Sequence, residues 1–399
     1  MQLANIHSVY FIGIGGIGMS ALARYFHHRG VRVAGYDRTE TELTRQLTAE
    51  GMTIHYTEDV AQLPDDIDLV VYTPAVPASH AELVHLREQG LPVYKRSQVL
   101  GVISEGMYTI AIAGTHGKTT TTTLTTHLLR HGGNDSSAFL GGVARNFGSN
   151  FVAGNNGWVV VEADEYDRSF LTLQPDIAVI IAMDPDHLDI YGDEDSLLET
   201  GFLAFAQRLK AGGRLFVRHD LAPHFAGKME VKTFGVDGGD YRSKNLRVED
   251  GYFVFDYHSP NFSIKGLRHP HPGRHNVENA TAAITVALER GISPAAIREG
   301  LLTFRGIGRR FEFIIREPEV VYVDDYAHHP AELTAAIDAA RTLYPDRKIT
   351  GIFQPHLYSR TRDFVDGFAE ALDQLDEIFL MDIYPAREEP TAYLSASPN

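Results

Sequence analysis

The segment GTHGKTT at residues 114–120 carries the residue types that hold a nucleotide phosphate. An apolar run precedes it and a predicted helix follows, so successive backbone N–H groups and the helix N-terminus would face the anion. Lys118 could then reach the β- and γ-phosphates, and the Thr119 hydroxyl could hold Mg²⁺. Ile112 stands where the first glycine of the usual pattern belongs, so a tight turn with a chance lysine is the alternative. The segment predicts a phosphate loop.

A second glycine turn, GIGGIGMS at residues 13–20, follows the apolar run VYFI. The spacing of Gly13, Gly15 and Gly18 fits the dinucleotide fingerprint, and Asp37 follows at about the distance expected of a ribose-binding acid. Taken alone, the turn is typical of an NAD-dependent oxidoreductase. An oxidoreductase of that class would leave the phosphate loop without a role. The two nucleotide-like sites therefore indicate that the phosphate loop binds ATP and that the glycine turn at residues 13–20 binds a substrate carried on a nucleotide.

Acidic residues follow two predicted strands, at the end of a parallel sheet where ligands gather. The first set lies in VVVEADEYDRSF and comprises Glu162, Asp164, Glu165 and Asp167. Because Mg²⁺ on a nucleotide takes one or two carboxylates plus water, one of them is expected to complete a metal site. The second set, MDPDHLD, contains His187, whose residue type alone favours a polar loop residue bonded to Asp184 or Asp186.

Polar clusters further along the chain have less specific patterns. In GRHNVENA, Asn276 and Asn279 stand at the start of a predicted helix, where helix capping and contact with a base or phosphate both remain open. GIGRRFE, DDYAHHP and QPHLYSRTRDF gather arginines, histidines and acids at predicted strand ends. Arginine binds carboxylate or phosphate in a bidentate manner, so these segments predict a polar cleft.

The elements that position these residues alternate between strands and helices in three successive stretches. SVYFIGI, VRVAGYD, DLVVYTPAV and LPVYKR predict strands of a first parallel sheet, and a new apolar strand starts before the phosphate loop. The segment 232–266 alternates polar and apolar residues with frequent turns, which predicts a small antiparallel extension. A third βαβαβ run begins beyond GIGRRFEF. We therefore expect an α/β protein with domains at 1–103, 104–312 and 313–399.

The composition fits this division and excludes several function classes. The chain has 399 residues, 44% of them hydrophobic, a formal charge of -16 and no cysteine. The charge disfavours nucleic acid and anionic membranes as partners, and the missing cysteines exclude disulfides and thiolate metal sites. Neither a signal-peptide pattern nor a long apolar run is present, so a soluble cytoplasmic protein is expected.

Together the motifs resemble the Mur ligase family. FIGIGGIGMSALA, GTHGKTTTT, EADEYDRSF, MDPDHLDIYG, GRHNVENA, DDYAHHPAE, FQPHLYSRTRDF and DIYPAREEP occur in that family's order from residue 9 to about 390. The resemblance implies a Rossmann-like UDP-binding domain, a central ATPase domain and a Rossmann-like amino-acid-binding domain. It further implies ATP and Mg²⁺ as cofactors, with L-alanine joined to the lactyl carboxylate of UDP-N-acetylmuramate through an acyl phosphate in peptidoglycan precursor synthesis.

The resemblance also assigns roles to individual residues. Those implied for ATP are Gly114, Thr115, His116, Gly117, Lys118, Thr119, Thr120, His275, Asn276, Asn279, Arg310 and Asp325. Those implied for the UDP-sugar are Gly15, Gly16, Gly18, Met19, Ser20, Asp37, Thr73 and Arg309. Those implied for the amino acid are Tyr326, His328, His356 and Arg360. Thr119, Glu162 and His187 are implied as metal ligands, and Lys118, Glu162 and His187 as catalytic residues.

Two features depart from the family pattern. The third domain is expected to be shortened, because TAYLSASPN follows DIYPAREEP where the family continues with further strands and a helix. DEYD replaces the commoner DESD, a change also seen in the related ligase that attaches a recycled tripeptide. The alternatives to the L-alanine ligase are that tripeptide ligase, an NAD-dependent oxidoreductase, and a nucleotide-binding module that the shortened third domain leaves without catalytic turnover. The expected state is a monomer or homodimer.

Overall fold

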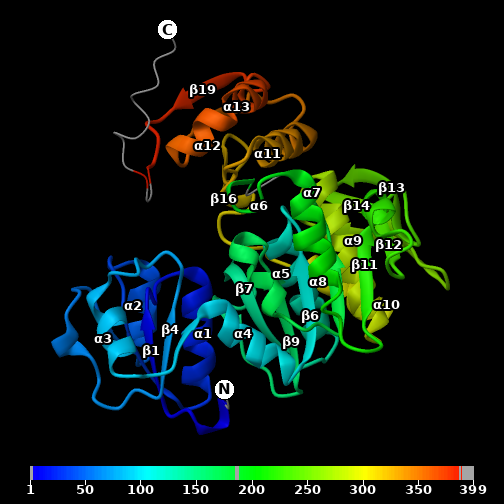
Figure 1. Cartoon of the computed structure of the whole chain (residues 1–399). Helices are drawn as coiled ribbons and strands as arrows, with labels where there is room; N and C mark the ends of the chain where they lie inside the picture. The colour runs from blue at the N-terminus through cyan, green and yellow to red at the C-terminus, as the bar shows by residue number, and fades with distance from the viewer. Residues whose placement is uncertain (1–2, 185–187, 386–387, 389–399) are drawn as a thin grey trace.

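The computed structural model describes residues 3–184, 188–385 and 388 and shows three lobes along the chain (Figure 1). The first lobe, in blue, and the central lobe, in cyan to yellow, lie side by side, and the third lobe lies above the central one (Figure 1). The predicted division after residue 103 falls inside the last helix of the first lobe. The predicted division after residue 312 falls just after the first residue of β16 (Glu312–Arg316). These divisions stay predictions.

The first lobe is a five-stranded parallel sheet with the order β3-β2-β1-β4-β5. Its strands are β1 (Ser8–Ile12), β2 (Arg32–Tyr36), β3 (Thr53–His55), β4 (Leu69–Tyr72) and β5 (Val93–Lys95). Its helices are α1 (Ile17–His28), α2 (Glu42–Ala49), α3 (Ala81–Glu88) and α4 (Arg96–Glu105). Four strands match the sequence prediction. The fifth, β3, was not predicted, because its three residues, one exposed and two partly buried, make no apolar run.

The central lobe contains one ten-stranded sheet with the order β15-β14-β13-β12-β11-β10-β6-β9-β7-β8. The strands are β6 (Tyr108–Ala113), β7 (Ser137–Ala144), β8 (Ser149–Val152), β9 (Trp158–Ala163), β10 (Ile177–Ile180), β11 (Arg214–Arg218), β12 (Lys232–Val236), β13 (Tyr241–Glu249), β14 (Tyr252–His258) and β15 (Ser263–His269). The extension predicted at residues 232–266 is antiparallel only from β13 to β15. Its first strand, β12, pairs in parallel with both β11 and β13, so the extension continues the parallel part of the sheet.

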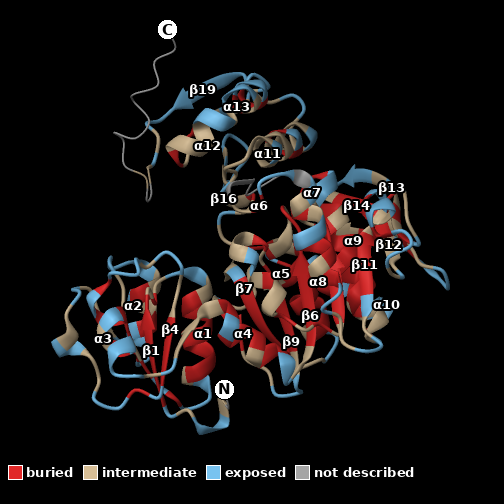
Figure 2. Ribbon diagram, viewed as in Figure 1, coloured by how far each residue is buried: buried red, intermediate tan, exposed pale blue. Residues whose placement is uncertain are grey.

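Helices cover both faces of the central sheet, and the buried residues concentrate in its middle strands (Figure 2). The helices are α5 (Lys118–His131), α6 (Leu188–Tyr191), α7 (Glu194–Ser196), α8 (Ala204–Ala206), α9 (Arg274–Glu289) and α10 (Pro294–Thr303). Leu124 and Leu128 of α5 share one apolar core with Val277 and Ile284 of α9. The N-termini of the two helices lie next to each other, since a Cβ on Gly117 would be 2.6 Å from Asn279 Oδ1. No helix within the described residues is long and apolar enough to cross a membrane.

The third lobe has the predicted βαβαβ order of elements, preceded by β16, which the sequence pattern did not predict. Its described strands form two separate pairs, antiparallel β16–β17 (Val321–Asp324) and parallel β18 (Thr350–Phe353)–β19 (Glu377–Leu380). A cavity of about 400 Å³, lined by both β17 and β18, lies between them. The helices are α11 (Pro330–Leu343), α12 (Tyr358–Asp363) and α13 (Val365–Leu372). The apolar pattern identified β17, β18 and β19 but not how they pair, because strand pairing depends on distant contacts that no local pattern contains.

Candidate active site

The predicted phosphate loop connects β6 to α5 and is shaped by two glycines. Gly114 has a φ of +145°, and a Cβ there would lie 2.6 Å from Ile181 Cγ1. Gly117 has a φ of +76° and precedes α5 with no side-chain hydrogen bond to the helix start. The first N–H groups of α5 are therefore left for another acceptor, which is the arrangement that binds phosphate at a helix N-terminus.

Lys118, the first residue of α5, is held by two carboxylate oxygens. Its ammonium donates to Glu165 Oε2 at 2.7 Å, to Glu165 Oε1 at 3.0 Å and to the Gly114 carbonyl at 2.7 Å. Burial alone would lower the pKa of Lys118, but Glu165, Asp164 and Glu162 outweigh it and raise the pKa above its ordinary value. Lys118 is therefore a charged donor whose three protons all have acceptors, so contact with a phosphate requires an exchange of partners.

Thr119 and Glu162 meet beside this lysine. The Thr119 hydroxyl lies 2.9 Å from Glu162 Oε2 and 3.1 Å from Oε1 at the end of β9. Burial raises the pKa of Glu162, and Lys118 opposes that shift. A hydroxyl and a carboxylate are hard oxygen ligands of the kind Mg²⁺ takes beside nucleotide phosphates, so the pair fits that ion. Within the described part of the chain no group of three or more His, Asp or Glu side chains could hold a metal, and His187 lies outside it.

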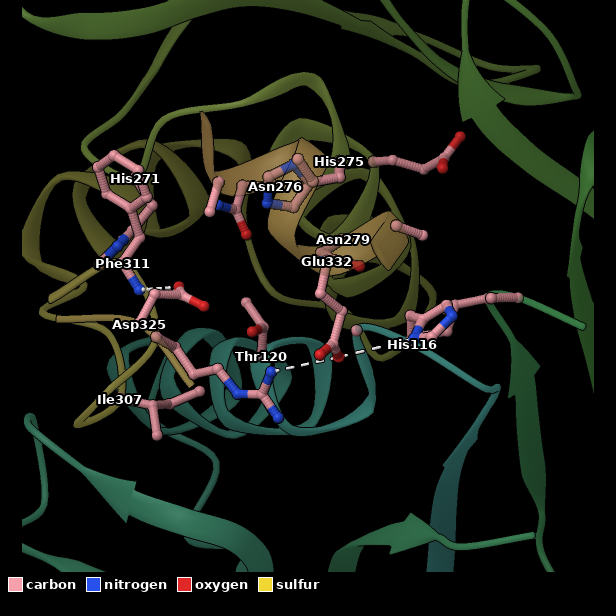
Figure 3. Close-up of a pocket in the computed structure, with 18 of the residues that line it drawn as sticks. His116, Thr120, His271, His275, Asn276, Asn279, Ile307, Phe311, Asp325 and Glu332 are labelled. Carbon is pink, nitrogen blue, oxygen red and sulfur yellow. Dashed lines mark hydrogen bonds and ion pairs between the residues drawn. The ribbon is translucent and has the colours of Figure 1, made fainter. Parts of the chain in front are cut away.

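A cavity of about 250 Å³ opens between the N-termini of α5 and α9 and the start of α11 (Figure 3). Eight of the residues predicted for ATP line it: His116, Gly117, Thr120, His275, Asn276, Asn279, Arg310 and Asp325. Asp325 accepts hydrogen bonds from the backbone N–H groups of Phe311 at 2.6 Å and Ala327 at 2.7 Å. The structure thus brings segments more than 200 residues apart into one chamber, which we call the nucleotide cavity.

A second cavity of about 200 Å³ surrounds the phosphate loop itself and is called here the phosphate cavity. Lys118, Thr119 and Glu162 line it together with His328 and Arg360 of the third lobe. The other two residues predicted for the amino acid lie behind His328 and do not line this cavity. The ring centroid of His328 is 4.9 Å from that of Tyr326 and 6.4 Å from that of His356.

A third cavity, of about 710 Å³, separates the first lobe from the central one and is called here the interlobe cavity. Of the residues predicted for the UDP-sugar, it is lined by Gly16, Gly18, Met19 and Thr73. Gly141 and Glu162 line it as well, so this cavity and the phosphate cavity share two residues. A ligand in the interlobe cavity can therefore extend to the phosphate loop.

The remaining residues predicted for the UDP-sugar do not line the interlobe cavity. Asp37 accepts a hydrogen bond from the Gly15 N–H at 2.7 Å, so both residues stabilise the glycine turn from behind. Ser20 is buried and accepts from Asn150 Nδ2 at 2.8 Å. Arg309 lies in the connection to the third lobe, where its Nε is 3.6 Å from Asp324 Oδ2.

Sequence reasoning missed Arg96 and Glu332. Arg96 lines the interlobe cavity, and a Cβ on Gly18 would lie 2.7 Å from its NH1 atom, so it brings positive charge to the glycine turn. It follows Lys95 in LPVYKRSQ, a segment without a recognisable binding motif. Glu332 lines both the nucleotide and the phosphate cavities. An acid in the first turn of a helix is a common stabilising feature, so its type gave no functional signal.

Comparison with known families assigns nearly the whole chain. Residues 8–108 match the description "Mur ligase family, catalytic domain", and residues 112–287 match "Mur ligase middle domain". Residues 309–397 match "Mur ligase, glutamate ligase domain". The three matches follow one another in the order of the three lobes.

Individual relatives agree with that assignment. The chain is 50% identical to a UDP-N-acetylmuramate--L-alanine ligase of Cytophaga hutchinsonii, over 98% of this chain and 86% of the relative. It is 48% identical to a protein of the same name from Flavobacterium johnsoniae, again over 98% and 86%. The crystal structure of UDP-N-acetylmuramate-alanine ligase MurC from Thermotoga maritima superposes with a TM-score of 0.83 at 32% identity, covering 94% of this chain and 85% of the other. This chain belongs to the Mur ligase family.

Proposed function

We propose that this chain is an ATP-dependent ligase that joins L-alanine to the lactyl carboxylate of UDP-N-acetylmuramate in peptidoglycan precursor synthesis. The observation that carries the proposal is the continuity of the three cavities. Glu162 and Gly141 line both the interlobe and phosphate cavities, and His116 and Glu332 line both the phosphate and nucleotide cavities. A nucleotide sugar, a triphosphate and an amino acid can thus meet at Lys118.

The proposed reaction has two steps. A carboxylate oxygen of the sugar attacks the γ-phosphorus of ATP, the bond to ADP breaks, and an acyl phosphate forms. Lys118 and the N–H groups at the start of α5 stabilise the charge on the phosphate oxygens. Thr119 and Glu162 would hold Mg²⁺, which supplies further positive charge to those oxygens when bound.

In the second step the amine of L-alanine, having lost a proton, attacks the acyl carbon, and inorganic phosphate leaves. His328 and Arg360 lie on the third-lobe side of the phosphate cavity and would bind the amino acid there. The guanidinium of Arg360 suits the α-carboxylate. Water would hydrolyse the acyl phosphate, so docking of the third lobe over the phosphate loop serves to exclude it.

The alternatives are less well supported. An NAD-dependent oxidoreductase leaves Lys118, Thr119 and Glu162 without a role beside the interlobe cavity. A ligase that attaches a tripeptide shares the fold, as the murein peptide ligase of Psychrobacter arcticus shows with a TM-score of 0.74 at 23% identity. The higher identity to the alanine-named relatives favours L-alanine. A cytoplasmic location, where ATP is available, belongs to the same proposal.

Phosphate release tests the proposal. The full chain is incubated with ATP, Mg²⁺ and UDP-N-acetylmuramate, and the amino-acid component is L-alanine, glycine, D-alanine or a tripeptide. We expect release that depends on L-alanine, and loss of at least about 100-fold in a Lys118→Met variant, the scale reported for removing one charge-stabilising donor. Equal rates with and without L-alanine, or a preference for the tripeptide, would contradict the proposal.

A further inference from the structure

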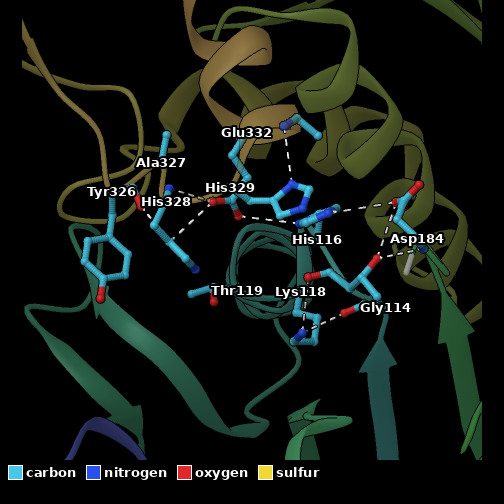
Figure 4. Close-up of polar contacts among 12 residues, drawn as sticks. Gly114, His116, Lys118, Thr119, Asp184, Tyr326, Ala327, His328, His329 and Glu332 are labelled. Carbon is cyan, nitrogen blue, oxygen red and sulfur yellow. Dashed lines mark hydrogen bonds and ion pairs between the residues drawn. The ribbon is translucent and has the colours of Figure 1, made fainter. Parts of the chain in front are cut away.

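Glu332 lies where the third lobe meets the phosphate loop. It belongs to the first turn of α11, and its side chain is 16% exposed. Glu332 Oε1 is 3.6 Å from His116 Nδ1 and 3.5 Å from an Arg310 guanidinium nitrogen. Oε2 accepts from the His328 N–H at 3.1 Å and lies 3.3 Å from His328 Nδ1 (Figure 4). One carboxylate thus contacts three separate segments of the site.

These three segments serve different parts of the proposed reaction. His116 stands inside the phosphate loop, two residues before Lys118. Arg310 lines the nucleotide cavity and is predicted to contact a phosphate. His328 lines the phosphate cavity on the side expected to hold the amino acid. Glu332 therefore connects the nucleotide side of the site to the amino-acid side.

The charges around Glu332 keep it ionised. Burial alone would raise the pKa of its carboxyl group, but His116, His328 and Arg310 outweigh burial and lower that pKa well below its usual range. On the far side of the His116 ring, Asp184 Oδ2 lies 4.0 Å from Nε2 (Figure 4). His116 is thus placed between two carboxylates, one from the central lobe and one from the third.

A simpler role for Glu332 is stabilisation of α11 through the helix dipole. That role requires only a negative charge in the first turn, and it does not require both oxygens to face the phosphate loop and His328. The N–H of Ala331 already bonds to the ring of His329, which precedes the helix, at 3.3 Å. The His329 ring also lies 5.1 Å from the His116 ring, so the start of α11 is seated on the phosphate loop.

We propose that Glu332 is a positioning residue that couples nucleotide binding to amino-acid binding, by fixing His116 and Arg310 relative to His328. The inference rests on the proposed function for the identity of the two ligands. Coupling between two sites is reciprocal, so it is measurable from either ligand. An aspartate at position 332 keeps the charge at the helix start but is too short to reach both sides.

The test is calorimetric titration of the full chain with the Mg²⁺ complex of the imido analogue of ATP, with and without L-alanine. UDP-N-acetylmuramate is present throughout. The wild-type chain is expected to bind the analogue about 5-fold or more tightly with L-alanine present, within the usual range of coupling between sites. Glu332→Asp and Glu332→Gln are both expected to reduce that ratio to below about 2-fold, near the limit at which the ligands bind independently.

Glu370→Gln is the matched control, because Glu370 is an exposed carboxylate on α13 of the same lobe. It should keep the wild-type ratio, and thermal unfolding of each variant reports folding. A wild-type ratio of 1, or an Asp variant that behaves like wild type, would overturn the inference. If the wild-type chain couples the ligands but releases no phosphate, the proposed function fails and the inference about Glu332 stands.

Discussion

At the scale of single residues, the site depends on the absence of a side chain at Gly141. Gly141 of β7 faces the contact between Glu162 and Thr119, and a Cβ there would overlap the Glu162 carboxylate and lie 2.8 Å from Thr119 Oγ1. The side chains of Thr119 and Glu162 can therefore occupy this space because residue 141 is glycine. Any larger side chain must displace one of the two predicted metal ligands.

The variant Gly141→Ala is expected to reduce kcat/KM by about 10- to 100-fold, the cost typical of disturbing the surroundings of a metal ligand. The apparent affinity for Mg²⁺ should weaken at the same time, which a titration of rate against Mg²⁺ measures. Gly106→Ala is the control, since a Cβ at that exposed position would meet no atom closer than 3.9 Å. Equal rates for the two variants would contradict this account of Gly141.

Sequence patterns identified the residues that lie within a short recognisable motif. Lys118, Thr119 and Glu162 were predicted in this way, and the structure brings them together. Glu165 was included only as one of four acids, and its bidentate contact with Lys118 was not foreseen. Glu332 and Arg96 could not be predicted, because their roles arise from contacts between segments that lie far apart in the sequence. His187 lies outside the described residues and stays a prediction.

At the scale of elements, α5 is held in place from its far side by α10. His127 of α5 is buried, and its Nε2 lies 3.0 Å from the Gly300 carbonyl and 3.1 Å from Thr303 Oγ1. Burial lowers the pKa of His127 to about 4, although the Gly300 carbonyl opposes the shift. Between pH 6.5 and 4 the unfolded chain therefore binds a proton here that the folded chain does not. Folding stability must fall as the pH decreases through this range.

The variant His127→Gln removes this titration while keeping an N–H donor for Gly300. Between pH 7 and pH 4.5 its free energy of unfolding should decrease by about 2 kcal/mol less than that of the wild-type chain. Urea unfolding at both pH values measures the difference. His224→Gln, at an exposed position, should change nothing. If both variants keep the wild-type pH dependence, His127 does not titrate as described.

Elements with a strong apolar period were predictable, and short or glycine-interrupted ones were not. β6, β9 and β10 are continuous apolar runs, and α9 has the expected extent. The β7–β8 hairpin was missed because Gly141 and Gly142 interrupt β7, although β7 supplies the wall beside Glu162. In the third lobe the predicted run contains β17, β18 and β19, whereas β16 and the division of the strands into two pairs were not predicted.

At the scale of the whole molecule, function depends on how three lobes share one set of cavities. The interlobe cavity lies between the first and central lobes, and the nucleotide cavity lies between the central and third lobes. Lys118, Thr119 and Glu162 stand where the two are joined through the phosphate cavity. The central claim is that a carboxylate from one side is phosphorylated by a nucleotide from the other.

The most direct test uses UDP-N-acetylmuramate labelled with ¹⁸O at both oxygens of the lactyl carboxylate. If an acyl phosphate forms and is displaced by L-alanine, one labelled oxygen leaves with the phosphorus while its partner remains in the amide. Mass spectrometry of the released phosphate should therefore find one ¹⁸O atom per molecule. Phosphate without label, released during amide formation, would contradict the account.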